Sequence, residues 1–178
     1  VASGHTSADL SYSSTTALTL PDGNTFLRDN LVNDGVLTLP VPGATNSLMA
    51  NKALVIDTEA PTAGTVSDGS GTDVTYSGSS TSVTANWTGF SDALSGIAGY
   101  EIAVGTTSGA TNVLSWTSAG NVTTYTKSDL SLTHATQYYV STRALDEAGN
   151  YSSAATANGV IIDIVAPSST VSIDSTTY

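Results

Sequence analysis

The sequence predicts an all-β protein made of short, mostly antiparallel strands, and three observations carry that prediction. Serine and threonine make up about 55 of the 178 residues, whereas lysine, glutamate and other residues that favour helices are scarce. Apolar and polar residues alternate along several segments, which is typical of strands with one buried face. Clusters rich in glycine, aspartate and serine separate these segments, as expected of the turns in a β-sandwich.

The alternation is clearest in three segments, which we predict to be strands of one domain. They run from Val83 to Trp87, from Tyr100 to Val104 and from Tyr138 to Leu145. The predicted turns between and beside the strands lie at 67–71, 91–96, 105–109, 148–150 and 158–159. Because Trp87 is one of the alternating apolar residues of its segment, we predict that it lies in the core between two sheets.

An internal repeat divides the chain. The segment Val55-Ile56-Asp57-Thr58-Glu59-Ala60-Pro61 recurs as Ile161-Ile162-Asp163-Ile164-Val165-Ala166-Pro167, an offset of 106 residues. Repeats at a fixed period indicate arrays of similar units, and a proline in each joint favours an extended, non-helical linker. The repeat therefore predicts three parts. Residues 1–57 would end one unit, 58–163 would form a complete domain, and 164–178 would begin a further repeat.

The charge and composition exclude several kinds of partner. The formal net charge is −11, with only 4 lysine and arginine residues in the whole chain. Binding to nucleic acid depends on such cations, so a nucleic-acid partner is not expected. No apolar run approaches the roughly 20 residues of a membrane helix, so membrane insertion is not expected either. The absence of cysteine excludes disulfides and thiolate sites.

Nothing in the sequence predicts an enzyme. The two histidines, His5 and His134, fall in different predicted units, which disfavours a Ser-His-Asp arrangement. They also cannot supply the three or four ligands of a zinc site in a chain without cysteine. No phosphate-binding glycine-rich motif is present.

One group of acidic residues suggests a cation site. Because successive strands alternate in direction, we expect the entry to the 58–163 domain and two of its loops to meet at one pole. The residues gathered there would be Asp57, Glu59, Asp92, Asp146 and Glu147. Calcium binds 6–8 oxygen ligands of this kind, so these residues are candidate calcium ligands. The alternative is that Asp92 and Asp146 only form Asx-turns in exposed loops.

The residues of the central domain also carry a family resemblance. Trp87 ends one predicted strand and Tyr100 begins the next, and Asp146-Glu147-Ala148-Gly149-Asn150 fits a loop after the last long strand. The residues Leu132, Thr136, Tyr138, Val140, Thr142 and Ala144 are similar to the pattern L-x-x-x-T-x-Y-x-V-x-V-x-A, with Thr142 at the second valine. In these features residues 60–163 resemble a bacterial fibronectin type III domain, although His134 and Ala135 replace the family's usual Pro-Gly. Tyr138 would then form a tyrosine corner, with its hydroxyl bound to the preceding turn.

Residues 1–57 resemble the back half of a bacterial Ig-like repeat, because Asn51-Lys52-Ala53-Leu54-Val55-Ile56-Asp57 is similar to the end of such repeats. The two resemblances imply immunoglobulin-like and fibronectin type III β-sandwich modules in tandem. Such modules serve as spacers or stalks in large secreted adhesins and surface fibres of bacteria. The expected location is extracellular or on the cell surface. The expected partners are neighbouring repeats of the same chain and a cell-surface protein or glycan.

Two other functions stay open at this point. The chain could be a carbohydrate-binding or accessory module of a secreted hydrolase, with Trp116 and exposed tyrosines as the sugar platform. It could also recognise a protein through its polar loops, as antibody loops do. Two or more exposed aromatic rings in one plane would favour the carbohydrate function, because a spacer does not need them.

Overall fold

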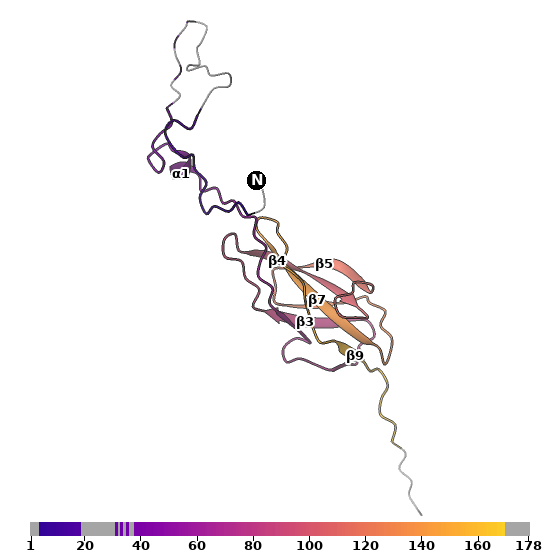
Figure 1. Cartoon of the computed structure of the whole chain (residues 1–178). Coiled ribbons are helices and arrows are strands. Elements are labelled where there is room, and N and C mark those ends of the chain that lie inside the picture. The colour runs from indigo at the N-terminus through magenta and orange to yellow at the C-terminus, as the bar shows by residue number, and fades with distance from the viewer. Residues whose placement is uncertain (1–3, 19–30, 32, 34, 36–37, 170–178) are drawn as a thin grey trace, which may run out of the picture.

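The computed structural model describes residues 4–18, 31, 33, 35 and 38–169. Figure 1 shows a β-rich module with an extended arm at one end, formed by the described residues before 58. The chain after β9 leaves the module at its opposite end. Residues 170–178, which belong to the third predicted part, lie outside the described residues.

The arm consists of two segments that run antiparallel to each other. Ser7 and Ile56 form a bridge, and the amide of Leu10 donates to the carbonyl of Leu54. The pairing at Ile56 is an isolated bridge and not part of a strand. One helix, α1 (Leu48–Asn51), begins after Ser47, whose hydroxyl accepts a hydrogen bond from the amide of Ala50. Among the described residues, no helix is both long and apolar enough to cross a bilayer.

Two sheets form the module, which confirms the all-β prediction. The strands are β1 (Thr65–Asp68), β2 (Tyr76–Ser77), β3 (Val83–Thr88), β4 (Ile97–Gly105), β5 (Leu114–Gly120), β6 (Thr124–Lys127), β7 (Gln137–Asp146), β8 (Ala155–Thr156) and β9 (Val160–Ile162). The first sheet has the order β1-β3-β6 and the second β2-β9-β7-β4-β5, with β8 paired to β7. The chain crosses between the sheets after β1, since β2 pairs parallel with β9.

The core lies between these sheets and is built by the inward positions of the alternating segments. Trp87 is buried on β3, as predicted, and its ring lies 5.4 Å from that of Tyr100 on β4. Phe90 packs edge-on against the same tyrosine at 5.6 Å. The other buried side chains of this cluster are Val83, Ala85, Ile102, Val104, Leu132, Tyr138, Val140, Ala144, Val160 and Ile162.

The sequence was misleading at the first predicted turn. Ser67 and Asp68 were expected in a turn cluster, but they are the last residues of β1. Asp68 is opposite Ala85 of β3 and shares its inward face. Of the predicted turn cluster, only Gly69, Ser70 and Gly71 lie after the strand.

Tyr138 ties the start of β7 to the turn before it. Its hydroxyl accepts a hydrogen bond of 3.0 Å from the amide of Thr133, while its ring is buried in the core. This is the contact expected of a tyrosine corner, so that local prediction is confirmed. The turn itself holds Ala135 at a φ of 60°, the left-handed region where a glycine is commonly found.

We therefore expect Tyr138→Phe to lower the free energy of unfolding by about 1 kcal/mol, because the amide of Thr133 loses its partner while the ring still fills the core. Urea denaturation of both proteins measures the difference. Tyr125→Phe is the matched control, since the hydroxyl of this half-buried tyrosine makes no hydrogen bond within the described residues. Equal losses in the two variants would contradict the role of the Tyr138 hydroxyl.

Candidate metal centre

Three of the five predicted acidic residues meet at the joint between the arm and the module. Asp57 comes from the linker, Asp92 from the loop between β3 and β4, and Asp146 from the end of β7. One carboxylate oxygen of each lies within 4.8 Å of the other two. Asp57 and Asp146 are 9% and 1% exposed, and Asp92 is half-buried. The expected meeting of linker and loops at one pole is thus present.

Asp57 connects the linker directly to the module. Its Oδ2 accepts hydrogen bonds from the hydroxyl of Ser95 at 2.5 Å and from the amide of Ser95 at 3.2 Å. Its Oδ1 accepts from the amide of Glu59 at 3.0 Å, which fixes the linker just after the aspartate. The loop between β3 and β4 therefore holds the carboxylate of a residue that precedes the module.

Asp92 organises that loop. Its Oδ1 accepts hydrogen bonds from the amides of Leu94, Ser95 and Gly96 at 3.0, 2.8 and 2.8 Å. These bonds, that from Gly96 first, hold the pKa of the Asp92 carboxyl below its usual value. Within the described residues no hydrogen bond reaches Oδ2 of Asp92. This oxygen is free to coordinate a ligand.

Asp146 is buried and is the last residue of β7, whereas the sequence placed it in the loop that follows. Its Oδ1 accepts hydrogen bonds from the amides of Ala148 and Asn150 at 2.9 and 2.8 Å, and its Oδ2 accepts from the side-chain amide of Asn150 at 2.8 Å. The same amide group of Asn150 lies 3.4 Å from the carbonyl oxygen of Asp57. Asp146 is buried because its carboxylate binds the amides of the turn after β7 and also faces the linker.

The two glutamates of the predicted set do not join this group. The side chains of Glu59 and Glu147 are exposed, and neither belongs to the cluster of three. They contribute through their backbones, since the amide of Glu59 binds Asp57 and the amide of Glu147 donates to the carbonyl of Gly96. The Asx-turn alternative is also realised, because Asp92 and Asp146 both bind amides two residues ahead.

The electrostatics of the three carboxylates favour a cation. Each pair of full charges at such a separation repels by about 3 kcal/mol at an effective dielectric constant of 20. Calcium prefers carboxylate and carbonyl oxygens, and the joint offers three carboxylates. A divalent ion bound there would replace repulsion between linker and loops by attraction to a shared centre.

A second polar cluster lies on the outer face of the larger sheet. The guanidinium of Arg143 lies 4.5 Å from the ring centre of Trp116 and 4.0 Å from that of Tyr151. It forms an ion pair of 2.6 Å with Glu101, which also accepts a hydrogen bond from the hydroxyl of Tyr151. Each ring therefore has a cation against it, the arrangement of a stabilising cation–π contact.

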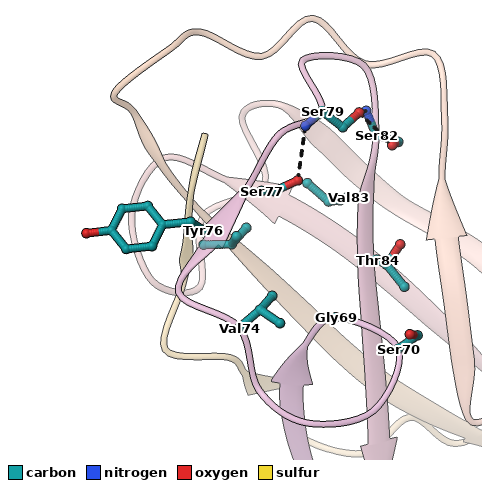
Figure 2. A pocket seen from close by; sticks show the side chains of 10 residues that line it. Gly69, Ser70, Val74, Tyr76, Ser77, Ser79, Ser82, Val83 and Thr84 are labelled. Carbon is teal, nitrogen blue, oxygen red and sulfur yellow. Dashed lines mark hydrogen bonds between the residues drawn. The ribbon is translucent and has the colours of Figure 1, made fainter. Parts of the chain in front are cut away.

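A cavity of about 340 Å³ opens between the chain around β2 and strand β3 (Figure 2). Its lining consists of hydroxyl and small apolar groups and includes no charged side chain. Figure 2 shows the ring of Tyr76 directed away from the other lining side chains. His5 lies beside Thr58 and His134 beside Asp163, and neither histidine lines this cavity.

No protein-family model matches the chain, and a search of curated proteins likewise returns no match.

We expect calcium to stabilise the chain through this centre. At ten times a dissociation constant of 10⁻⁴–10⁻³ M, binding adds about 1.4 kcal/mol, which raises the melting temperature by roughly 3–5 °C. Asp92→Asn should abolish most of this rise, because it replaces the free Oδ2 with an amide nitrogen while Oδ1 still accepts the loop amides. Thermal denaturation with and without calcium measures both effects.

Asp129→Asn is the matched control, since Asp129 is exposed and has a φ of 60°, a conformation that asparagine tolerates. It should respond to calcium like the wild type. A melting curve that calcium does not move, or equal shifts in the wild type and Asp92→Asn, would reject the centre.

Proposed function

We propose that the chain is a non-catalytic segment of immunoglobulin-like and fibronectin type III-like modules in tandem. It would act as a spacer or stalk in an adhesin or fibre on the bacterial cell surface. The observation that carries the proposal is the insertion of the linker carboxylate Asp57 into the loops of the module. A contact of this kind holds the preceding segment end-on, which a stalk requires.

The arrangement of strands supports the finer fold assignment. Two sheets of mainly antiparallel strands pack over a core that contains Trp87 and Tyr138, within the expected 58–163 segment. Immunoglobulin-like sandwiches have this layout and about this length, and many carry a tyrosine corner. The transfer of the chain from the β1 edge of one sheet to the β2 edge of the other fits the same architecture.

The local geometry of the two joints supports the tandem arrangement. Asp57 accepts a hydrogen bond from the amide of Glu59 at 3.0 Å. The repeat places Asp163 at the equivalent position, and it accepts one from the amide of Val165 at 3.2 Å. The same two-residue turn thus occurs at both joints. Each joint would give the next module one carboxylate in the same orientation.

Calcium would set the stiffness of such a stalk. Without a cation, hydrogen bonds from Ser95 hold Asp57 against two like charges, and the joint can open as a hinge. With calcium bound, linker and loops share ligands of one ion, and the joint becomes rigid. Extracellular modules bind calcium at about 10⁻⁴–10⁻³ M, which fits a protein that works outside the cell.

The carbohydrate-binding alternative rests on one observation, the two aromatic rings of Trp116 and Tyr151 on the same sheet face. Tyr151 is 39% exposed, but Arg143 lies against one face of each ring. Stacking of a sugar would need those faces or their reverse sides to be free. A glycan array tests this alternative, because binding that is lost in Trp116→Ala would replace the spacer function with a lectin-like one.

The spacer function makes a prediction about shape. A compact protein of this length has a radius of gyration of roughly 16 Å, whereas arm and module lie end to end in Figure 1. We expect small-angle X-ray scattering to give a value well above roughly 16 Å and an elongated distance distribution. A value at the compact limit would mean that the arm folds back on the module, and would contradict the spacer function.

A further inference from the structure

Another aspartate, Asp68, is more deeply buried than the three aspartates of the joint. It is the last residue of β1 and is 0% exposed. Its partner in the adjacent strand is Ala85, whose side chain is in the core. A carboxylate at an inward position is unusual, because burial penalises the charged form unless a cation or several hydrogen bonds compensate.

The hydrogen bonds of Asp68 compensate only one of its two oxygens. Oδ2 accepts a hydrogen bond of 2.9 Å from the amide of Gly159, in the turn between β8 and β9. Oδ1 is buried, and within the described part of the chain it has no hydrogen-bond partner. Since β1 belongs to one sheet and β9 to the other, this single bond fastens the two sheets together at that end of β1.

A second carboxylate, Asp73, lies beside the first. Its Oδ1 accepts a hydrogen bond of 2.9 Å from the amide of Asp68, and its Oδ2 accepts one of 2.9 Å from the side-chain amide of Asn158. The amide of Val74 donates to the carbonyl of Asp68 at 3.2 Å. The end of β1, the 69–74 loop and the 158–159 turn are therefore joined through two acidic side chains.

The elements around Asp68 supply no compensating cation. β3 and β8 carry no titratable side chain, and β7 carries Tyr138, Tyr139, Arg143 and Asp146. Arg143 is paired with Glu101 on the outer face, and Asp146 belongs to the joint. Tyr139 packs beside Gly159. Among the described residues, no lysine or arginine forms an ion pair with Asp68.

This environment shifts the ionisation of Asp68. Desolvation raises the pKa of its carboxyl from 3.8 to about 6, against the lowering effect of the Gly159 amide and with a further rise from Asp73. When this end of the module opens and water reaches the carboxyl, the pKa returns to its ordinary value. Between these two values the closed state binds the proton more tightly than the open state does. Opening therefore becomes easier as the pH rises through this range.

We propose that Asp68 is a proton-controlled latch, which holds β1 and the 69–74 loop to the 158–159 turn when protonated and loosens this contact when ionised. The groups that it holds form part of the cavity in Figure 2, because Gly69, Ser70 and Val74 line one side and Val160 follows the 158–159 turn. Ionisation would thus loosen the wall of this cavity, at the other end of β1 from the joint. The latch does not depend on the stalk function.

Amide hydrogen exchange of the full chain tests the latch residue by residue. The measured quantities are the protection factors of the Gly159 and Val74 amides. Each is a ratio to the intrinsic exchange rate, so the intrinsic pH dependence of exchange cancels. We expect these factors to fall by on the order of 50–100-fold between pH 4 and pH 8, since a pKa difference of about two units is about a hundredfold in an equilibrium constant. A carbon-detected titration of the Asp68 carboxyl should have its midpoint near the same value of about 6.

Asp68→Asn should make both protection factors independent of pH, whereas Asp129→Asn, in an exposed loop, should leave the wild-type profile unchanged. Asp73→Asn should move the midpoint to lower pH, because the like charge beside Asp68 is removed. A wild-type midpoint below about 4.5, pH-independent protection in the wild type, or an unchanged profile in Asp68→Asn would overturn the proposal. The wild-type titration decides the question even where the Asp68 variant does not fold.

Discussion

The arm and the module are joined through the carboxylate of Asp57. Its bonds to Ser95 are the direct side-chain contact from the linker to the loop between β3 and β4. They bring a third acidic group against Asp92 and Asp146. The geometry of the joint is thus set by a balance between hydrogen bonds that draw Asp57 inward and like charges that oppose it. We therefore expect a change in this balance to alter how firmly the loop holds the linker.

The same kind of constraint recurs inside the module with a different outcome. Asp92 and Asp146 each accept several backbone hydrogen bonds, so their negative charge is supported by the turns that they organise. Among the residues that the structure describes, Asp68 has one such bond and one oxygen without a partner. Burial therefore holds the pKa of Asp68 high, whereas backbone amides hold the pKa of Asp92 low. We therefore propose that identical side chains respond to different stimuli, a cation at one site and a proton at the other.

The sequence predicted the features that depend on local pattern. Alternation located the central parts of β3, β4 and β7, and the alternating direction of strands brought Asp57, Asp92 and Asp146 to one pole. It did not predict the parallel pairing of β2 with β9, because a two-residue strand has no periodicity to detect. It also missed the burial of Asp68, since the glycines and serines after it have the composition of an exposed turn. The stacking of Arg143 between Trp116 and Tyr151 depends on residues distant in sequence, which no local pattern relates.

The most direct test of the central claim is to measure how the arm and the module tumble relative to each other. Backbone ¹⁵N relaxation of the full chain gives separate rotational correlation times for residues 38–57 and 62–163. We predict two distinct correlation times without calcium, and one shared value in about 10 mM calcium, ten or more times the dissociation constant expected of an extracellular site. Asp92→Asn should keep the two values distinct in calcium. Correlation times that calcium leaves unchanged in the wild type would contradict the view of this joint as a cation-stiffened hinge.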